Sequence, residues 1–216
     1  MSDFLQTMAA ASAERAAAVD AGSLKGDPAP VVPLRLGEFD VIAEIKDRSP
    51  AEGDHATPES DRAERARQYA AGGAAAISVL TEPSRFAGSL AHLEEVAAAV
   101  PGVPVMRKDF LVDPVQVLEA RSAGASGVLL IINMLPDDVL HTMLDACFDN
   151  GMFVLLEGFD ADDLDRATAL LREPVFGSKA AGGQLLVGVN TRNLRTLHVD
   201  PDRLATLAPS LPAARC

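Results

Sequence analysis

The segment GVLLII at residues 127–132 decides the fold, together with the amphipathic run at 137–148 and the apolar run MFVLL at 152–156. The first and third segments carry no polar residue on either face, which is typical of strands buried on both sides of a parallel sheet. The run between them has helical periodicity and ends near Asn150-Gly151, a pair that favours a helix stop. Strand, helix and strand in this order predict a βα unit with a right-handed crossover.

The same alternation extends along the rest of the chain. The other short apolar runs lie at residues 41–45, 74–80, 103–106 and 185–189. The other helical patterns lie at residues 60–71, 90–100, 115–123, 160–171 and 200–207. These six βα units predict an α/β fold, either an open doubly wound sheet or a barrel. No G-x-G-x-x-G follows any of the apolar runs, which disfavours a dinucleotide-binding sheet.

The two remaining segments flank or interrupt this pattern. Residues 2–20 have the composition of a helix, and a linker containing Gly and Pro connects them to the first strand. Residues 172–184 (REPVFGSKAAGGQ) have the composition of an inserted loop. We therefore expect an N-terminal helical extension over residues 1–37 and one α/β domain, an open sheet or a barrel, over residues 38–216.

Composition narrows the class of protein. The chain has 216 residues, a formal net charge of −12 and 48% hydrophobic residues, as expected for one globular domain. The acidity argues against a nucleic-acid partner, and no apolar run approaches the roughly 20 residues that a membrane span requires. The N-terminus lacks the pattern of a secretory signal, and Cys147 and Cys216 form no disulfide framework. We expect a cytoplasmic protein with no nucleic-acid or membrane partner.

Charged and polar residues follow the apolar runs, at the strand ends where βα folds place their ligands. They are Glu44, Lys46, Arg48, Ser49, Thr81, Glu82, Arg107, Lys108, Asp109, Asn133, Glu157, Asn190, Arg192 and Asn193. The basic members of this set predict an anion site at one rim of the sheet. The four histidines have no metal-ligand spacing, so we expect no metal.

Two of the four lysines in the chain, Lys46 and Lys108, lie at these strand ends. Lysine can lose its proton where arginine cannot, so either lysine could serve as a general acid or as a Schiff-base amine. Glu44 and Glu157 are candidates for a general base and for electrostatic partners of the lysines. The alternative is that the lysines are solvated rim charges and that Glu157 only pairs with one of them.

The strand-end residues lie within segments that resemble the indole-3-glycerol-phosphate synthase family, whose members are (β/α)8 barrels. The similar segments are 41–50 (VIAEIKDRSP), 75–82 (AAISVLTE), 86–90 (FAGSL), 105–114 (VMRKDFLVDP), 119–132 (EARSAGASGVLLII) and 187–194 (VGVNTRNL). The resemblance implies a lyase of tryptophan biosynthesis that uses neither cofactor nor metal. Its substrate is a phosphosugar, 1-(2-carboxyphenylamino)-1-deoxyribulose 5-phosphate, which loses carbon dioxide and water to give indole-3-glycerol phosphate.

The resemblance also implies roles for individual residues. Lys108 matches the general acid of ring closure, Glu157 the general base of dehydration, and Lys46 the lysine that engages the substrate carboxylate. Glu44 and Asn190 match residues that orient the substrate and the lysines. The remaining matches are Ser49 and Arg192 near the phosphate, and Phe110, Phe86 and Leu130 against the anthranilate ring.

Three functional alternatives remain open from the sequence. The chain stops at Cys216, where the seventh strand of the family would begin, so the barrel is expected to be incomplete at its C-terminal side and to lack most of the phosphate-binding loops. It is therefore a lyase that is completed elsewhere, a non-catalytic remnant or interaction protein of the same fold, or another phosphosugar enzyme such as an isomerase of the same pathway. We expect weak activity or none from residues 1–216, and self-association through the open barrel edges.

Overall fold

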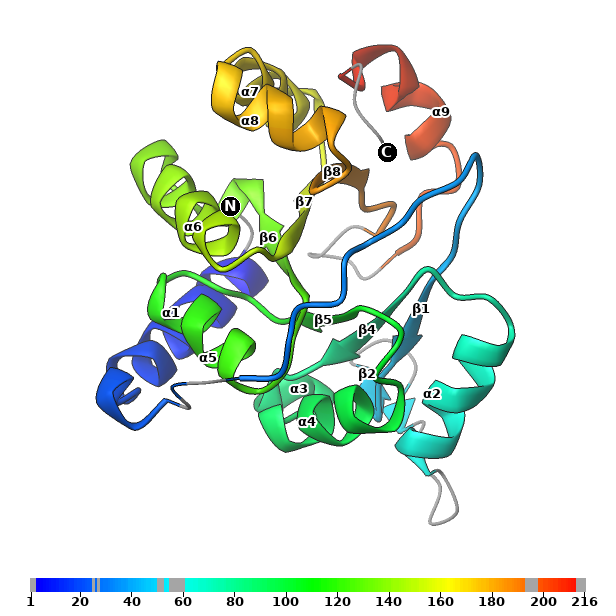
Figure 1. The fold of residues 1–216 in the computed structure, drawn as a ribbon. Coiled ribbons are helices and arrows are strands. Elements are labelled where there is room, and N and C mark those ends of the chain that lie inside the picture. Colours follow the sequence, from blue (N-terminus) through cyan, green and yellow to red (C-terminus); the bar gives the residue numbers. More distant parts are fainter. Residues whose placement is uncertain are drawn as a thin grey trace.

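The computed structural model describes residues 3–24, 26, 28–49, 53–54, 61–192 and 198–212. Within these ranges six parallel strands form one sheet in the order β1-β4-β5-β6-β7-β8. The strands are β1 (Ile42–Ile45), β4 (Ala76–Leu80), β5 (Val105–Lys108), β6 (Gly127–Ile131), β7 (Phe153–Gly158) and β8 (Leu185–Val189). The sheet curls into part of a barrel, with helices on its outer side (Figure 1). All six strands expected from the apolar runs are confirmed, and so is the α/β barrel class.

Helices alternate with the strands as the sequence predicts. The α-helices are α1 (Asp3–Ala17), α2 (Arg62–Ala71), α3 (Pro83–Phe86), α4 (Leu90–Ala99), α5 (Val115–Ser122), α6 (Asp137–Asp149), α7 (Ala161–Leu171), α8 (Pro174–Ala181) and α9 (Arg203–Leu207). Short 3-10 turns are η1 (Ala21–Ser23), η2 (Ile132–Met134) and η3 (Ala208–Ser210), and β2 (Arg48–Ser49) pairs with β3 (Gly53–Asp54). None of the helices in these described ranges is long and apolar enough to cross a membrane.

One expectation about secondary structure is wrong. Residues 172–184 are not a loop, because helix α8, which begins at Pro174 and ends at Ala181, occupies most of that segment. Phe176 and Ala180, four residues apart on one helical face, are both buried. Proline is well suited to the first turn of a helix, and burial of this apolar pair stabilises a segment whose glycines argue against a helix.

The strand residues alternate between two environments. Ala76, Met106 and Phe153 form a small apolar cluster inside the barrel, while neighbouring residues such as Val105 and Val154 belong to the main core beneath the helices. Side chains two positions apart share one face of a strand. The polar side chains that follow this inward alternation at the carboxyl ends of the strands therefore also point into the barrel. This placement creates the site described below.

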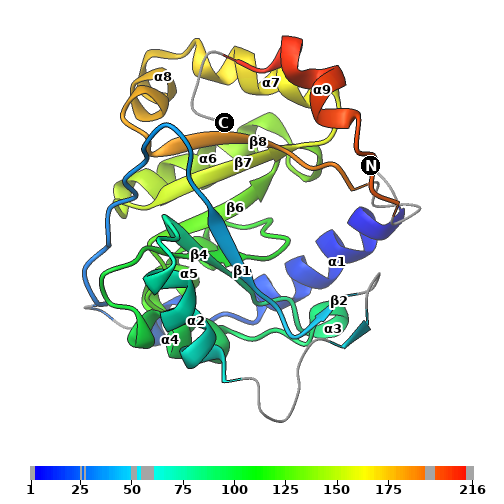
Figure 2. The ribbon, with the colours of Figure 1, turned by 90° about the vertical axis from the view of Figure 1, so that its right-hand side faces the viewer.

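Helix α1 packs on the barrel rather than standing apart from it. Leu5 and Met8 are buried in the same core as the strands. Figure 2 shows α1 lying beside the ends of the strands, close to β2 and α3. The N-terminal segment therefore contributes to the surroundings of the strand ends.

Candidate active site

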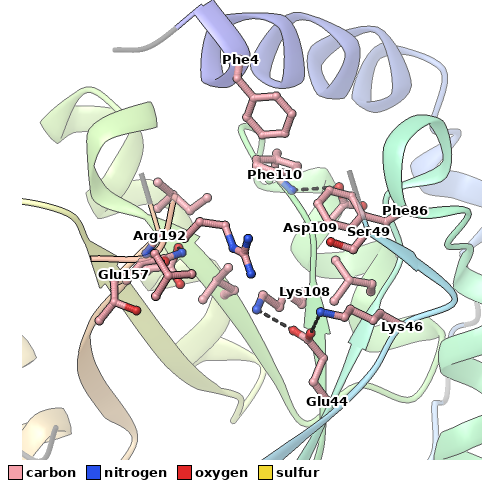
Figure 3. Close-up of a pocket in the computed structure, with 16 residues that line it drawn as sticks. Phe4, Glu44, Lys46, Ser49, Phe86, Lys108, Asp109, Phe110, Glu157 and Arg192 are labelled. Atoms are coloured by element: carbon pink, nitrogen blue, oxygen red, sulfur yellow. Dashed lines mark hydrogen bonds and ion pairs between the residues drawn. The ribbon is translucent and has the colours of Figure 1, made fainter. Parts of the chain in front are cut away.

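A cavity of about 320 Å³ opens at the carboxyl ends of the strands. Its polar lining consists of Glu44, Lys46, Ser49, Lys108, Asp109, Glu157, Asn190, Thr191 and Arg192. Its apolar lining consists of Phe4, Leu80, Phe86, Phe110, Leu129, Ile131 and Val199. Figure 3 shows these side chains around the cavity; they come from strands β1, β2, β4, β5, β6 and β7, from the segments that follow β1, β5 and β8, and from helices α1 and α3. The structure thus brings together all the residues to which the family resemblance gives a role, except Leu130.

Two lysines share one carboxylate at the floor of the cavity. Lys108 Nζ donates to Glu44 Oε2 over 2.6 Å, and Lys46 Nζ lies 3.4 Å from Glu44 Oε1 (Figure 3). Burial by itself would raise the pKa of Glu44, but the two ammonium groups outweigh it and hold that pKa below its ordinary value. Burial likewise opposes charge on Lys108, yet the carboxylates of Glu44 and Glu157 raise its pKa above the ordinary value. Lys108 is therefore held in its charged ammonium form, which carries the proton that a general acid would donate.

Glu157 provides the second carboxyl group. Asn190 Nδ2 donates to Glu157 Oε1 over 3.0 Å, and Asn190 Oδ1 accepts from the backbone N–H of Arg192 over 2.8 Å. Burial raises the pKa of Glu157, and Lys108 and Asn190 offset only part of that effect. A carboxyl group with a raised pKa is suited to exchange protons near neutral pH.

Three phenylalanines form what we call the aromatic wall: Phe4, Phe86 and Phe110. The ring of Phe4, from helix α1, meets Phe110 edge to face at 5.8 Å and 76°. The rings of Phe86 and Phe110 lie 6.1 Å apart with their planes tilted by 37°. These separations suit attractive aromatic contacts, and the wall gives one side of the cavity an affinity for a flat apolar group.

The structure corrects the placement of Leu130. This side chain is fully buried and does not reach the cavity, whereas its neighbours Leu129 and Ile131, which belong to the same core, also line the cavity. Successive residues of a strand point to opposite faces, so Leu130 belongs to the helix-facing side of β6.

Two arginines of the expected anion site also point elsewhere. Arg107 is buried on the outer side of β5, where it donates to Glu119 Oε2 over 2.7 Å and to the carbonyl of Gln116 over 3.0 Å. Arg48 donates to the backbone carbonyls of Ser84 and Arg85. Among the residues that the structure describes, the cations that line the cavity are Lys46, Lys108 and Arg192.

Several lining residues escaped the analysis of the sequence. Leu129 and Ile131 lie in an all-apolar strand, where the sequence does not show which alternate residues face the cavity. Phe4 lies about forty residues before the first strand and carries no motif; only its position on an apolar helical face with Leu5 and Met8 could have indicated it. Asn193, which follows β8, lies outside the described residues.

The arrangement combines acid, base and anion-binding groups in one partly apolar cavity. Lys108 can donate a proton, Glu157 can accept one, and Lys46 and Arg192 can attract an anion. Among the described residues, no group of three or more His, Cys, Asp or Glu side chains is arranged to hold a metal ion.

Comparison with known proteins identifies the family. The family model for indole-3-glycerol phosphate synthase matches residues 33–216. An indole-3-glycerol phosphate synthase from Nocardioides sp. is 47% identical over 94% of this chain and 75% of its own length. One from Parafrankia sp. is 48% identical over 83% of this chain and 62% of its own length. The chain thus spans roughly three-fifths to three-quarters of the curated relatives that it matches.

Among solved structures, dihydropteroate synthase from Yersinia pestis is similar with a TM-score of 0.50 at 17% identity. This similarity covers 78% of this chain and 68% of that structure, and it concerns the fold alone. The family model and the curated relatives carry the assignment: the chain belongs to the indole-3-glycerol phosphate synthase family.

Proposed function

We propose that this chain carries the lyase chemistry of its family on 1-(2-carboxyphenylamino)-1-deoxyribulose 5-phosphate. The observation that carries the proposal is the placement of Lys108, Glu44 and Glu157 in one cavity, with Lys108 Nζ 2.6 Å from Glu44 Oε2. An ammonium group and a carboxyl group with a raised pKa can divide the roles of acid for ring closure and base for dehydration.

In ring closure, the aryl carbon that carries the carboxylate forms a bond to the ketone carbon. Lys108 donates its proton to the ketone oxygen, which becomes a hydroxyl group. Carbon dioxide then leaves, and the electrons of the broken bond restore the aromatic ring. Lys46 is placed beside Glu44 to engage the carboxylate before it leaves.

In dehydration, Glu157 removes a proton from the carbon next to the ring nitrogen. The hydroxyl group departs as water after taking up a proton, so one proton is released and one is consumed in this step. The double bond formed between the two carbons completes the indole. The hydrogen bond from Asn190 orients the Glu157 carboxyl group for this transfer.

The rest of the cavity suits the two ends of this substrate. The aromatic wall, with Leu129 and Ile131, offers an apolar surface for the aryl ring. Ser49 and Arg192 lie in the lining and offer a hydroxyl and a guanidinium group to the phosphate. We assign the ligand class accordingly: an aryl-substituted phosphosugar.

The test is turnover of this substrate followed by indole fluorescence, since the chain contains no tryptophan. We expect weak turnover that Lys108→Ala abolishes. Lys179→Ala is the matched control, because Lys179 lies on helix α8 over the Phe148 ring and outside the cavity. Absence of turnover from folded protein, or turnover that survives Lys108→Ala, would overturn the proposal.

We further infer a cytoplasmic location with no nucleic-acid or membrane partner. The net charge of −12 disfavours binding to phosphate backbones. The buried free thiol of Cys147 fits a reducing compartment.

A further inference from the structure

The two oxygens of Asp109 hold different parts of the molecule. Oδ2 accepts from Thr81 Oγ1 over 2.8 Å and from Arg107 Nη2 over 3.1 Å, both of which are fixed in the barrel. Oδ1 accepts from the backbone N–H of Phe110 over 2.8 Å and from Arg15 Nη2 over 2.7 Å. One oxygen therefore joins Phe110 to helix α1, which carries Arg15.

Arg15 also reaches the segment that carries the third ring of the aromatic wall. Its Nη1 lies 3.8 Å from Glu82 Oε1, and Glu82 caps helix α3 by accepting from the N–H groups of Ser84 and Arg85. Helix α3 ends at Phe86. The guanidinium group of Arg15 thus contacts two carboxylates, one that holds the backbone beside Phe110 and one that holds the backbone before Phe86. Phe4 lies on the same helix as Arg15, α1.

Charge compensation of Asp109 alone does not require its contact with Arg15. The Asp109 side chain is fully buried, but Arg107 already supplies a buried positive partner to it. Arg15 remains 28% exposed, so its ion pairs are partly screened by solvent. Arg15 also fixes the position of α1, because its contacts link this helix to the residues that follow β4 and β5.

We propose that Arg15 is a positioning residue that acts through Asp109 and Glu82 to set the three rings of the aromatic wall against one another. The identity of the ligand, a compound whose aryl group binds against that wall, rests on the proposed function. Phe4 transmits the effect, because its helix is the element that Arg15 anchors. The acid and base groups of the site are held by other contacts, so Arg15 governs binding of the aryl ring more than proton transfer.

The experiment measures affinity for indole-3-glycerol phosphate through the fluorescence of its own indole, together with kcat and KM. We expect Arg15→Ala to weaken binding and raise KM about tenfold, as loss of well-placed aromatic contacts would do, with kcat changed by less than about threefold. Arg15→Lys should restore part of the affinity. Glu14→Ala, an exposed neighbour on the same helix, should bind as the unchanged protein does. Unchanged affinity in Arg15→Ala, or a fall in kcat alone, would overturn the proposal.

A double-mutant cycle separates positioning from a general loss of stability. Because Arg15 acts on the same aromatic wall as Phe4, the protein with both Phe4→Ala and Arg15→Ala should lose less affinity than the sum of the two single losses, whereas independent effects would add. If Arg15→Ala does not fold, the same cycle with Arg15→Lys decides the question. Additive losses overturn the inference.

The binding measurements also separate this inference from the proposed function. A protein that binds indole-3-glycerol phosphate without turnover would contradict the proposed function, and the cycle would still decide the role of Arg15. A protein that neither binds nor turns over would contradict both.

Discussion

Lys108 on β5 and Glu44 on β1 are joined by a 2.6 Å hydrogen bond although strand β4 separates their strands in the sheet. The curvature of the barrel makes this possible, because inward side chains on next-but-one strands converge. The carboxylate keeps Lys108 protonated against the effect of burial. Of the two roles that the sequence left open for this lysine, the structure favours a general acid over a Schiff-base amine, which would need a free amine.

Turnover should depend on the ionised form of Glu157. Burial raises the pKa of Glu157, so lowering the pH should protonate the base, and turnover should fall at a pH above the ordinary range of a glutamate. Glu157→Gln should lower kcat by about 10² to 10⁴ and remove that acid limb from the pH–rate profile. Glu64→Gln, an exposed residue paired with Arg67, is the control. An unchanged acid limb in Glu157→Gln would contradict the assignment.

Leu129 and Leu130 both belong to the main core, but only Leu129 lines the cavity, so the two should differ in their effect on substrate binding. Leu129 lines the cavity, so Leu129→Ala should raise KM for the aryl substrate. Leu130 is fully buried in the main core, so Leu130→Ala should lower the free energy of unfolding by about 2 to 5 kcal/mol with little change in KM. Urea unfolding and steady-state kinetics on both variants check this. The opposite pattern would show that β6 presents its other face to the cavity.

Gly88 should not tolerate a side chain. A Cβ at this position would lie 2.4 Å from the carbonyl oxygen of Leu80, which is backbone and cannot move aside easily. Gly88→Ala should lower the free energy of unfolding by about 1 to 3 kcal/mol and weaken aryl binding by shifting nearby Phe86. At Gly102 a Cβ would meet nothing within 4 Å, so Gly102→Ala is the matched control. Equal stability of the two variants would be the contrary result.

His141 and His92 should affect stability in opposite directions as pH changes. The backbone carbonyl of Asp137 and the carboxylate of Glu173 raise the pKa of His141. Its stabilising contribution is therefore full below the unfolded pKa and is lost as pH rises through the higher folded pKa. Burial, assisted by Arg62, lowers the pKa of His92, so its contribution is lost as pH falls.

The melting temperatures of His141→Gln and His92→Gln, compared with the unchanged protein at about pH 5.5 and about pH 8.5, measure this difference. His141→Gln should be more destabilising at the lower pH, and His92→Gln at the higher pH. The same pH trend in both variants would refute the assignment.

Self-association remains a prediction for residues 1–216. Strands β1 and β8 are the edges of the described sheet, and Phe39 and Val41 beside β1 are 88% and 53% exposed. Unpaired strand edges and exposed apolar side chains favour pairing between copies. Sedimentation velocity should show larger species as concentration rises, and Phe39→Ser should reduce them. A protein that stays monomeric at every concentration would contradict the prediction of self-association.

The sequence by itself determined the alternation of strands and helices and the group of polar residues at the strand ends. Both follow from local chemistry: apolar runs such as 127–132 cannot remain in water, and the residue after each run must lie at a strand end. The positions of Lys108 and Glu157 on one rim follow from that rule and from the common direction of parallel strands.

Only the tertiary structure decided which way side chains face and which distant segments touch. In an apolar strand such as β6, the sequence does not distinguish the inward Leu129 from the outward Leu130. Arg107 and Lys108 are adjacent cations, yet the strand pleat sends one into the core and the other into the cavity. The contact between Arg15 and Asp109 joins residues 94 positions apart, and no local pattern encodes such a pair. It exists because packing of Leu5 and Met8 lays helix α1 against the barrel.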